Sequence, residues 1–249
     1  MYILLTNDDG IEAAGLRQLA DALIRAGHRV SVCAPAQQQS AASHSITLRR
    51  PLTVVPYDFP GAEIAYSVDG TPADCARMGV YLIRDADLVI SGINDGANMG
   101  GACIYSGTVA AAMEASMAGR PALAVSLCRF GAEDFSAAAK TAVKTAEWMT
   151  RHPLPRGGIY NLNVPDLPYD QIKGVRAASL APSYLEDPSY VVDDTSESVR
   201  YSYGSGSDAG RDLEGSDAAL TAQGWASLTK LTWDLTMNAP DPETEDLVL

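Results

Sequence analysis

The N-terminal stretch Tyr2-Ile3-Leu4-Leu5-Thr6-Asn7-Asp8-Asp9-Gly10 joins an apolar run to a polar turn, which is typical of a buried strand that ends in a loop. The next apolar residues recur at helical spacing, and Gly27 follows where the helix would end; these residues are Leu16, Leu19, Ala20, Leu23 and Ile24. Residues 29–34 then predict a second strand. A strand, a helix and a strand in succession indicate a parallel sheet with a right-handed crossover.

The alternation of strands and helices continues along the chain. The expected elements are a helix over 71–82, a strand over 87–91, a helix over 108–118, a strand over 122–127, a helix over 137–149 and a strand over 158–164. The sequence therefore predicts an α/β fold, a Rossmann-like, mostly parallel sheet with helices on both faces. Residues 183–216 indicate loops and hairpins, and residues 225–229 indicate one more strand.

Composition limits the function classes. The chain has 249 residues and a net charge of −13, with 47% hydrophobic and 20% charged residues, which are values typical of a folded globular protein. Residues 183–249 hold fourteen acidic and three basic residues, a net of −11, so the acidity belongs to the C-terminal part. The acidic, proline-containing stretch 238–246 is expected to be a solvated tail. This charge disfavours nucleic acid as the main partner.

The compartment is expected to be the cytoplasm. The four cysteines are widely spaced among apolar residues, which favours reduced thiols over a disulfide framework or a zinc site; they are Cys33, Cys75, Cys103 and Cys128. The N-terminal segment lacks the basic start of a secretory signal, and no apolar run approaches the roughly 18 residues of a membrane span. No membrane partner is therefore expected.

The first loop carries two adjacent carboxylates, Asp8 and Asp9, directly after the first strand. It lacks the glycine-rich fingerprint of a dinucleotide site. A divalent cation shared between the two carboxylates would keep both charged close to a phosphate. On this loop alone, an Asx turn that closes the strand explains the residues equally well.

Two later loops offer further oxygen donors. Residues 35–45 form a polar segment with Ser40 and His44, and the loop after the strand over 87–91 holds Asn94 and Asn98. Ligands of open α/β sheets bind where such loops gather, at the carboxyl ends of the strands. Carboxylate, hydroxyl and amide oxygens together suit Mg²⁺, Mn²⁺ or Ca²⁺ and disfavour zinc.

A fourth segment, Tyr105-Ser106-Gly107-Thr108, opens a helix that has no acidic residue in its first turn. Free backbone N–H groups and hydroxyls at a helix N-terminus bind phosphate, and Gly107 would let the anion approach. A plain Ser or Thr N-cap is the alternative interpretation. Next to a divalent ion, the segment becomes a predicted phosphate pocket.

Four blocks together resemble the SurE family, named for the stationary-phase survival protein E. They are Ile3-Leu4-Leu5-Thr6-Asn7-Asp8-Asp9-Gly10, Gly70-Thr71-Pro72-Ala73-Asp74-Cys75, Ser91-Gly92-Ile93-Asn94 and Tyr105-Ser106-Gly107-Thr108-Val109-Ala110-Ala111-Ala112-Met113-Glu114. The resemblance implies a metal-dependent phosphatase that acts on nucleoside 5′- and 3′-monophosphates. It also implies a homodimer or homotetramer built partly from exchanged C-terminal elements. We accordingly expect a catalytic core over 1–182 and, over 183–249, an acidic extension that completes the same domain.

The resemblance also assigns residues. The family's metal ligands fall on Asp8, Asp9, Ser40 and Asn94. Directly after the proline of the second loop, the family usually has an acidic and a basic residue, where this chain has Ala36 and Gln37. The change bears on substrate preference, and it keeps open a non-catalytic nucleotide-binding module.

The expected mechanism uses an ion, most simply Mg²⁺ or Mn²⁺, that activates water for attack on phosphorus. Asp8, Asp9, Asn98 and Ser106 are the candidate catalytic residues, and Ser106, Gly107 and Thr108 would bind the phosphate. His44 either protonates the leaving alkoxide or is a solvated loop histidine. An aspartyl-phosphate enzyme is a further alternative, although the Asp-x-Asp spacing of such phosphatases is absent.

Overall fold

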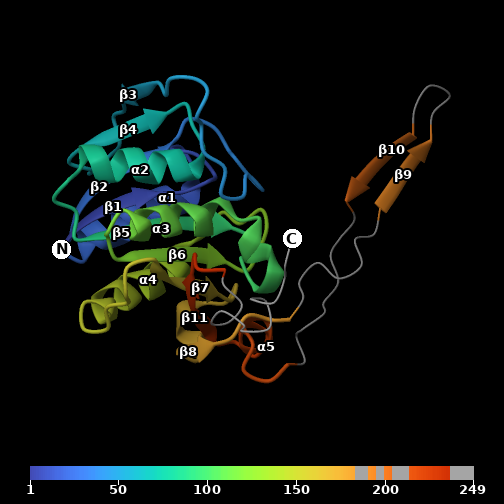
Figure 1. The fold of residues 1–249 in the computed structure, drawn as a ribbon. Helices are drawn as coiled ribbons and strands as arrows, with labels where there is room; N and C mark the ends of the chain where they lie inside the picture. The colour runs from blue at the N-terminus through green and yellow to red at the C-terminus, as the bar shows by residue number, and fades with distance from the viewer. Residues whose placement is uncertain (183–189, 195–198, 204–212, 236–249) are drawn as a thin grey trace, which may run out of the picture.

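A computed structural model of the chain describes residues 1–182, 190–194, 199–203 and 213–235 (Figure 1). A nine-stranded sheet in the order β3-β4-β2-β1-β5-β6-β7-β11-β8 lies at its centre. Its strands are β1 (Tyr2–Thr6), β2 (Arg29–Pro35), β3 (Val54–Pro56), β4 (Ala65–Val68), β5 (Leu88–Asp95), β6 (Ala122–Leu127), β7 (Gly158–Val164), β8 (Val175–Ala178) and β11 (Ala226–Thr232). Strands β4, β2, β1, β5, β6 and β7 run parallel, which confirms the predicted fold class.

Helices cover both faces of this sheet (Figure 1). They are α1 (Ala14–Arg25), α2 (Pro72–Leu82), α3 (Gly107–Met117), α4 (Ser136–Met149) and α5 (Asp217–Ala222), with short 3₁₀ turns η1 (Gly100–Ile104) and η2 (Tyr169–Gln171). Helices α1 and α4 pack together on one face, and α2 and α3 pack together on the other. Within these helices and the rest of the described residues, no helix has the length and apolarity to cross a bilayer.

Side chains of β1 point alternately to the two faces of the sheet, so this strand contributes to both layers of the core. Ile3 and Leu5 are fully buried in the cluster that includes α1 and α4, whereas Leu4 is fully buried in the cluster that includes α2 and α3. A parallel strand buried on both faces needs apolar residues at every position, and β1 has them. The register places Leu5 beside Val32 of β2 and Ile90 of β5, so these three strands end together at one edge.

The C-terminal part completes the sheet in a way that the sequence did not predict. The expected strand over 225–229 is β11, which lies antiparallel to β7 and parallel to β8, between the two. Strands β3 and β4, within residues 46–70, and helix α5 were also not predicted. Helix α3 begins at Gly107, one residue before the predicted start.

The predicted hairpin region contains β9 (Tyr190–Asp194) and β10 (Val199–Tyr203), which pair antiparallel. Figure 1 shows this hairpin extending away from the nine-stranded sheet. The expected solvated tail over 238–246 lies outside the described residues.

Candidate active site

The turn after β1 presents the two adjacent carboxylates. Asn7 Nδ2 donates to the Gly10 carbonyl at 2.9 Å, and the Gly10 amide donates to Asn7 Oδ1 at 3.3 Å. Gly10 has a φ of +101°, a left-handed conformation that glycine adopts readily. This closed turn fixes Asp8 and Asp9 at the carboxyl end of β1.

Asp8 lies against the N-terminus of α3. The Thr108 hydroxyl donates to Asp8 Oδ1, and a Cβ added at Gly107 would lie 2.8 Å from the Asp8 Cβ. The Asp8 side chain is buried, and burial raises its pKa from 3.8 to about 6. The neighbouring charge of Asp9 contributes to this increase in pKa, whereas the hydroxyl and backbone N–H of Thr108 limit it.

Asp9 accepts hydrogen bonds from the loop after β2 and from the last residue of β5. The Asp95 amide donates to Asp9 Oδ2 at 3.0 Å, and Gln38 Nε2 donates to Asp9 Oδ1 at 3.2 Å. Burial raises the pKa of the Asp9 carboxyl, and these two hydrogen bonds lower it in part. Asp9 thereby joins the turn after β1 to the loop that follows β2 and to the end of β5.

The other two predicted metal ligands lie one residue from these contacts. The Gln39 amide donates to the Asp8 carbonyl at 2.7 Å, and the exposed Ser40 follows directly. Asn94 precedes Asp95, and its Nδ2 donates to the Gly96 carbonyl at 2.7 Å. Because the Asn94 nitrogen is engaged there, Oδ1 is the atom that it can offer to a cation.

This donor set fits a hard divalent ion. In the part of the chain that the structure describes, no Lys, Arg or His forms an ion pair with Asp8 or Asp9. Two adjacent, largely buried carboxylates without such a partner repel one another, and a cation between them relieves the repulsion. The same described residues contain no cluster of three or more His, Cys, Asp or Glu, so the proposed set depends on Ser40 and Asn94.

Asn98 is buried in a network of amides beside this edge. Its Nδ2 donates to Ser126 Oγ at 2.8 Å, and its amide donates to Asn163 Oδ1 at 2.8 Å. Its carbonyl accepts from the Nδ2 atoms of Asn161 and Asn163, each at 2.9 Å. The network anchors the loop after β5 on β6 and β7.

The two hydroxyls at the start of α3 have different partners. Ser106 Oγ accepts from the Val109 amide at 3.1 Å, so Ser106 is the N-cap and keeps its hydroxyl proton for another acceptor. The Thr108 hydroxyl donates to Asp8, so it positions a carboxylate. His44 Nε2 lies 3.0 Å from Oε1 of the buried Glu114, although 34% of the His44 side chain remains exposed.

Sequence reasoning missed four residues that shape this edge, namely Gln38, Asp95, Asn161 and Asn163. Two asparagines at alternate positions of an otherwise apolar strand, Asn161 and Asn163, were a usable signal because they share one face of β7. Gln38 and Asp95 act through contacts between segments that lie far apart in the sequence. Local sequence carries no signal for such contacts.

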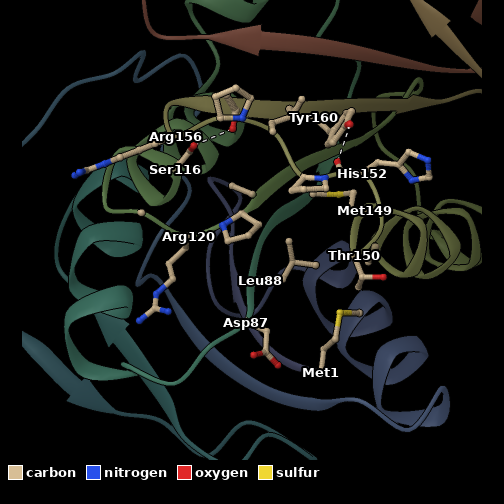
Figure 2. A pocket seen from close by; sticks show the side chains of 18 residues that line it. Met1, Asp87, Leu88, Ser116, Arg120, Met149, Thr150, His152, Arg156 and Tyr160 are labelled. Carbon is tan, nitrogen blue, oxygen red and sulfur yellow. Dashed lines mark hydrogen bonds between the residues drawn. The ribbon is translucent and has the colours of Figure 1, made fainter.

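A cavity of about 410 Å³ lies at the opposite edge of the sheet (Figure 2). Figure 2 shows Leu88 and Met149 among the side chains around it, and Arg156 donates to the Met117 carbonyl beside it. None of the predicted site residues lines this cavity. A smaller cavity of about 270 Å³ adjoins the carboxyl edge and is lined by Ala36, Gln37 and Gln39 among others.

Comparison with known proteins identifies the family of the chain. A family model described as survival protein SurE matches residues 3–187, which is most of the chain. The chain belongs to the SurE family. The resemblance based on the four sequence blocks is thereby confirmed.

Relatives within the SurE family match over nearly their full length. A 5′-nucleotidase SurE from Aeromonas hydrophila is 45% identical, over 95% of this chain and 94% of that protein. A 5′/3′-nucleotidase SurE from Erwinia tasmaniensis is 43% identical, over 96% of this chain and 93% of its own. The crystal structure of the SurE protein from Aquifex aeolicus has a TM-score of 0.83 and 33% identity, with 95% of each chain covered.

The raised pKa of Asp8 predicts how the stability of the metal-free protein depends on pH. An ordinary Asp gives up its proton near pH 3.8 when the chain is unfolded, whereas folded Asp8 keeps it to about 6. The contribution of Asp8 to the free energy of unfolding is therefore fully present below about pH 3.8 and is lost as the pH rises through about 6. The difference between these two pKa values corresponds to about 3 kcal/mol in the free energy of unfolding, most of it lost between about pH 4 and pH 7.

Urea unfolding of the metal-free wild type and the Asp8→Asn variant across that range would measure this loss. The variant cannot ionise at position 8, so its free energy of unfolding should change less with pH. Parallel curves for the two proteins would show that Asp8 does not titrate with a raised pKa.

Proposed function

We propose that this SurE-family chain hydrolyses nucleoside 5′- and 3′-monophosphates to nucleoside and phosphate at the carboxyl edge of the sheet. The observation that carries the proposal is the pair Asp8 and Asp9, which form no ion pair within the described residues, with Asp8 packed against the N-terminus of α3. The relatives named 5′-nucleotidase and 5′/3′-nucleotidase supply the substrate class.

Four oxygen donors would hold one divalent ion, Mg²⁺ or Mn²⁺. They are the carboxylates of Asp8 and Asp9, the Ser40 hydroxyl and the Asn94 amide oxygen. Such an ion neutralises charge on phosphoryl oxygens and lowers the pKa of water. Thr108 holds Asp8 by its hydroxyl, and Gln38 with the Asp95 amide holds Asp9, so both carboxylates are oriented before the ion binds.

The phosphate would lie at the N-terminus of α3, against Ser106, Gly107 and Thr108. The Ser106 hydroxyl keeps a proton for a phosphate oxygen, and the absence of a side chain at Gly107 lets α3 begin directly against Asp8. The positive end of the helix dipole favours negative charge there. Asn98 supports the site by fixing the loop after β5 through Ser126 and Asn163.

We further propose a homodimer or homotetramer located in the cytoplasm. Strands β9 and β10 form a two-stranded hairpin that Figure 1 shows extending away from the main sheet. An isolated hairpin of this kind is marginally stable in water, so pairing with a second copy would stabilise it.

The test uses metal-stripped full-length protein with nucleoside monophosphates and p-nitrophenyl phosphate, and follows free phosphate. Addition of Mg²⁺ or Mn²⁺ should raise phosphate release from nucleotides by at least about 100-fold, since charge neutralisation is worth several kcal/mol. Preference for nucleotides over the generic ester is also expected.

One result would contradict this function, and another would contradict the direct mechanism. Tight nucleotide binding without phosphate release under any divalent ion would favour the alternative of a non-catalytic nucleotide-binding module. Ala36 and Gln37 would then be the first residues to test as the cause of the missing activity. Trapping of an aspartyl-phosphate, in place of direct entry of solvent ¹⁸O into the product, would favour the covalent mechanism.

A further inference from the structure

We propose that the contact between His44 and Glu114 is a clamp that positions Ser40 and thereby raises the affinity of the site for its divalent ion. The inference rests on the proposed function and extends it to residues that do not touch the ion. His44 and Glu114 are 70 residues apart in the chain, and neither is a proposed ligand.

Glu114 is a buried carboxylate with a hydrogen-bonding partner on each of its two oxygens. It lies on α3, its residue is 5% exposed, and its Oε1 is 3.0 Å from His44 Nε2. Arg77 Nη1 donates to the other oxygen, Oε2, at 2.9 Å. The hydrogen bond from His44 and then the charge of Arg77 lower the pKa of Glu114, so the carboxylate stays charged. A buried charge holds its partners strongly because leaving it unpaired is costly.

The loop that carries Ser40 is fixed at both of its ends. On one side, the Gln39 amide donates to the Asp8 carbonyl at 2.7 Å. On the other side, Ser43 Oγ donates to the Ile104 carbonyl at 2.8 Å, and the Ser43 amide donates to the Tyr105 carbonyl at 3.0 Å. His44 follows directly and binds Glu114, so Ser40 lies between two anchors.

The backbone between these anchors is strained. Ala41 has a φ of 55° and Ser43 has a φ of 54°, both in the left-handed region that residues with a Cβ disfavour. Such conformations persist where surrounding contacts hold them. His44 is the residue after Ser43, so its bond to Glu114 helps to hold the strained end of the loop.

One rigid element connects the clamp to the carboxylates. Helix α3 carries Thr108 in its first turn, bonded to Asp8, and Glu114 further along, bonded to His44. The helix therefore fixes the position of Asp8 relative to the loop that carries Ser40. Loss of the clamp should let Ser40 move while Asp8 keeps its own contacts.

The experiment measures Mn²⁺ binding by calorimetry without nucleotide, and then kcat and KM with nucleotide at saturating Mn²⁺. His44→Ala should weaken Mn²⁺ binding by about 10-fold, the lower end of the effect of groups that orient metal ligands. Because added Mn²⁺ can fill the weakened site, kcat at saturation should stay within about 2-fold of the wild type. His44→Gln, which keeps an N–H donor, should restore most of the affinity.

Arg77→Gln is the matched control. It removes the other partner of Glu114 from an exposed position on α2 and leaves the loop anchors intact, so Mn²⁺ affinity should change by less than about 2-fold. Glu114→Gln offers a second route to the clamp if His44→Ala does not fold, and it should also weaken Mn²⁺ binding.

Two outcomes would overturn the clamp. One is unchanged Mn²⁺ affinity in both the His44→Ala and the Glu114→Gln variants. The other is a loss of kcat at saturating Mn²⁺ with unchanged affinity, because His44 would then act on the reaction itself. Failure of the wild type to bind Mn²⁺ would instead contradict the proposed function, so the two failures are distinguishable.

Discussion

Replacement of Asp8 by Asn should lower nucleotide hydrolysis by at least about 1,000-fold, because each tenfold loss corresponds to about 1.4 kcal/mol and charge neutralisation at phosphorus is worth several kcal/mol. The side chain keeps its size but loses the charge that would hold the ion. The fold should survive, since the amide oxygen of the new side chain could still accept from the Thr108 hydroxyl. Phosphate release at saturating Mg²⁺ or Mn²⁺ and the thermal midpoint would be measured together.

A matched variant separates a local effect from general loss of charge. Asp166 follows β7 at the same edge of the sheet, and its carboxylate accepts from Arg129 Nη1 at 2.9 Å on the surface. Asp166→Asn should leave hydrolysis within about 2-fold of the wild type, because exposed ion pairs contribute little. Retained activity in Asp8→Asn would remove Asp8 from the mechanism.

Replacement of Gly107 by Ala should also damage the site severely. The added Cβ would lie 2.8 Å from the Asp8 Cβ and 2.8 Å from Pro72 Cγ. Neither atom lies at the end of a flexible side chain, so α3 or the turn after β1 must shift. We expect a fall in kcat/KM of about 100-fold, because small displacements of reacting groups cost that much. Overpacking should lower the free energy of unfolding by about 1–3 kcal/mol.

Gly101→Ala is the control for this substitution. Gly101 lies in η1, close along the chain, and a Cβ there has nothing within 4 Å. Its activity and stability should match those of the wild type. If Gly107→Ala behaves like Gly101→Ala, the start of α3 does not pack on Asp8 as described.

The sequence was sufficient for the parallel half of the sheet. Runs such as residues 2–6 and 122–127 are apolar at nearly every position, and a strand buried on both faces requires that pattern. Strands β3 and β4 escaped prediction because they are short and partly exposed. The insertion of β11 between β7 and β8 could not be predicted either, since pairing between distant strands leaves no local signal.

The candidate site was likewise predictable only in part. Asp8 and Asp9 belong to one short continuous motif, and the start of α3 belongs to another. The residue types in these motifs alone predict a cation site and a phosphate site. The shape of the Ser40 loop depends on left-handed Ala41 and Ser43, residue types that do not signal that conformation. The partners of His44 and Asn98 lie far along the chain, so their roles needed the tertiary structure.

The position of β11 in the sheet also constrains the order in which the chain can fold during synthesis. Strand β7 ends at Val164, but its outer neighbour begins only at Ala226, so a ribosome must make more than sixty further residues before β7 is covered. Asp217 also accepts from the Gly100 amide at 2.9 Å, beside the loop that Asn98 anchors. We therefore expect that a nascent chain forms β1 and the helices around it early, yet becomes competent for catalysis only once its last described strand has docked.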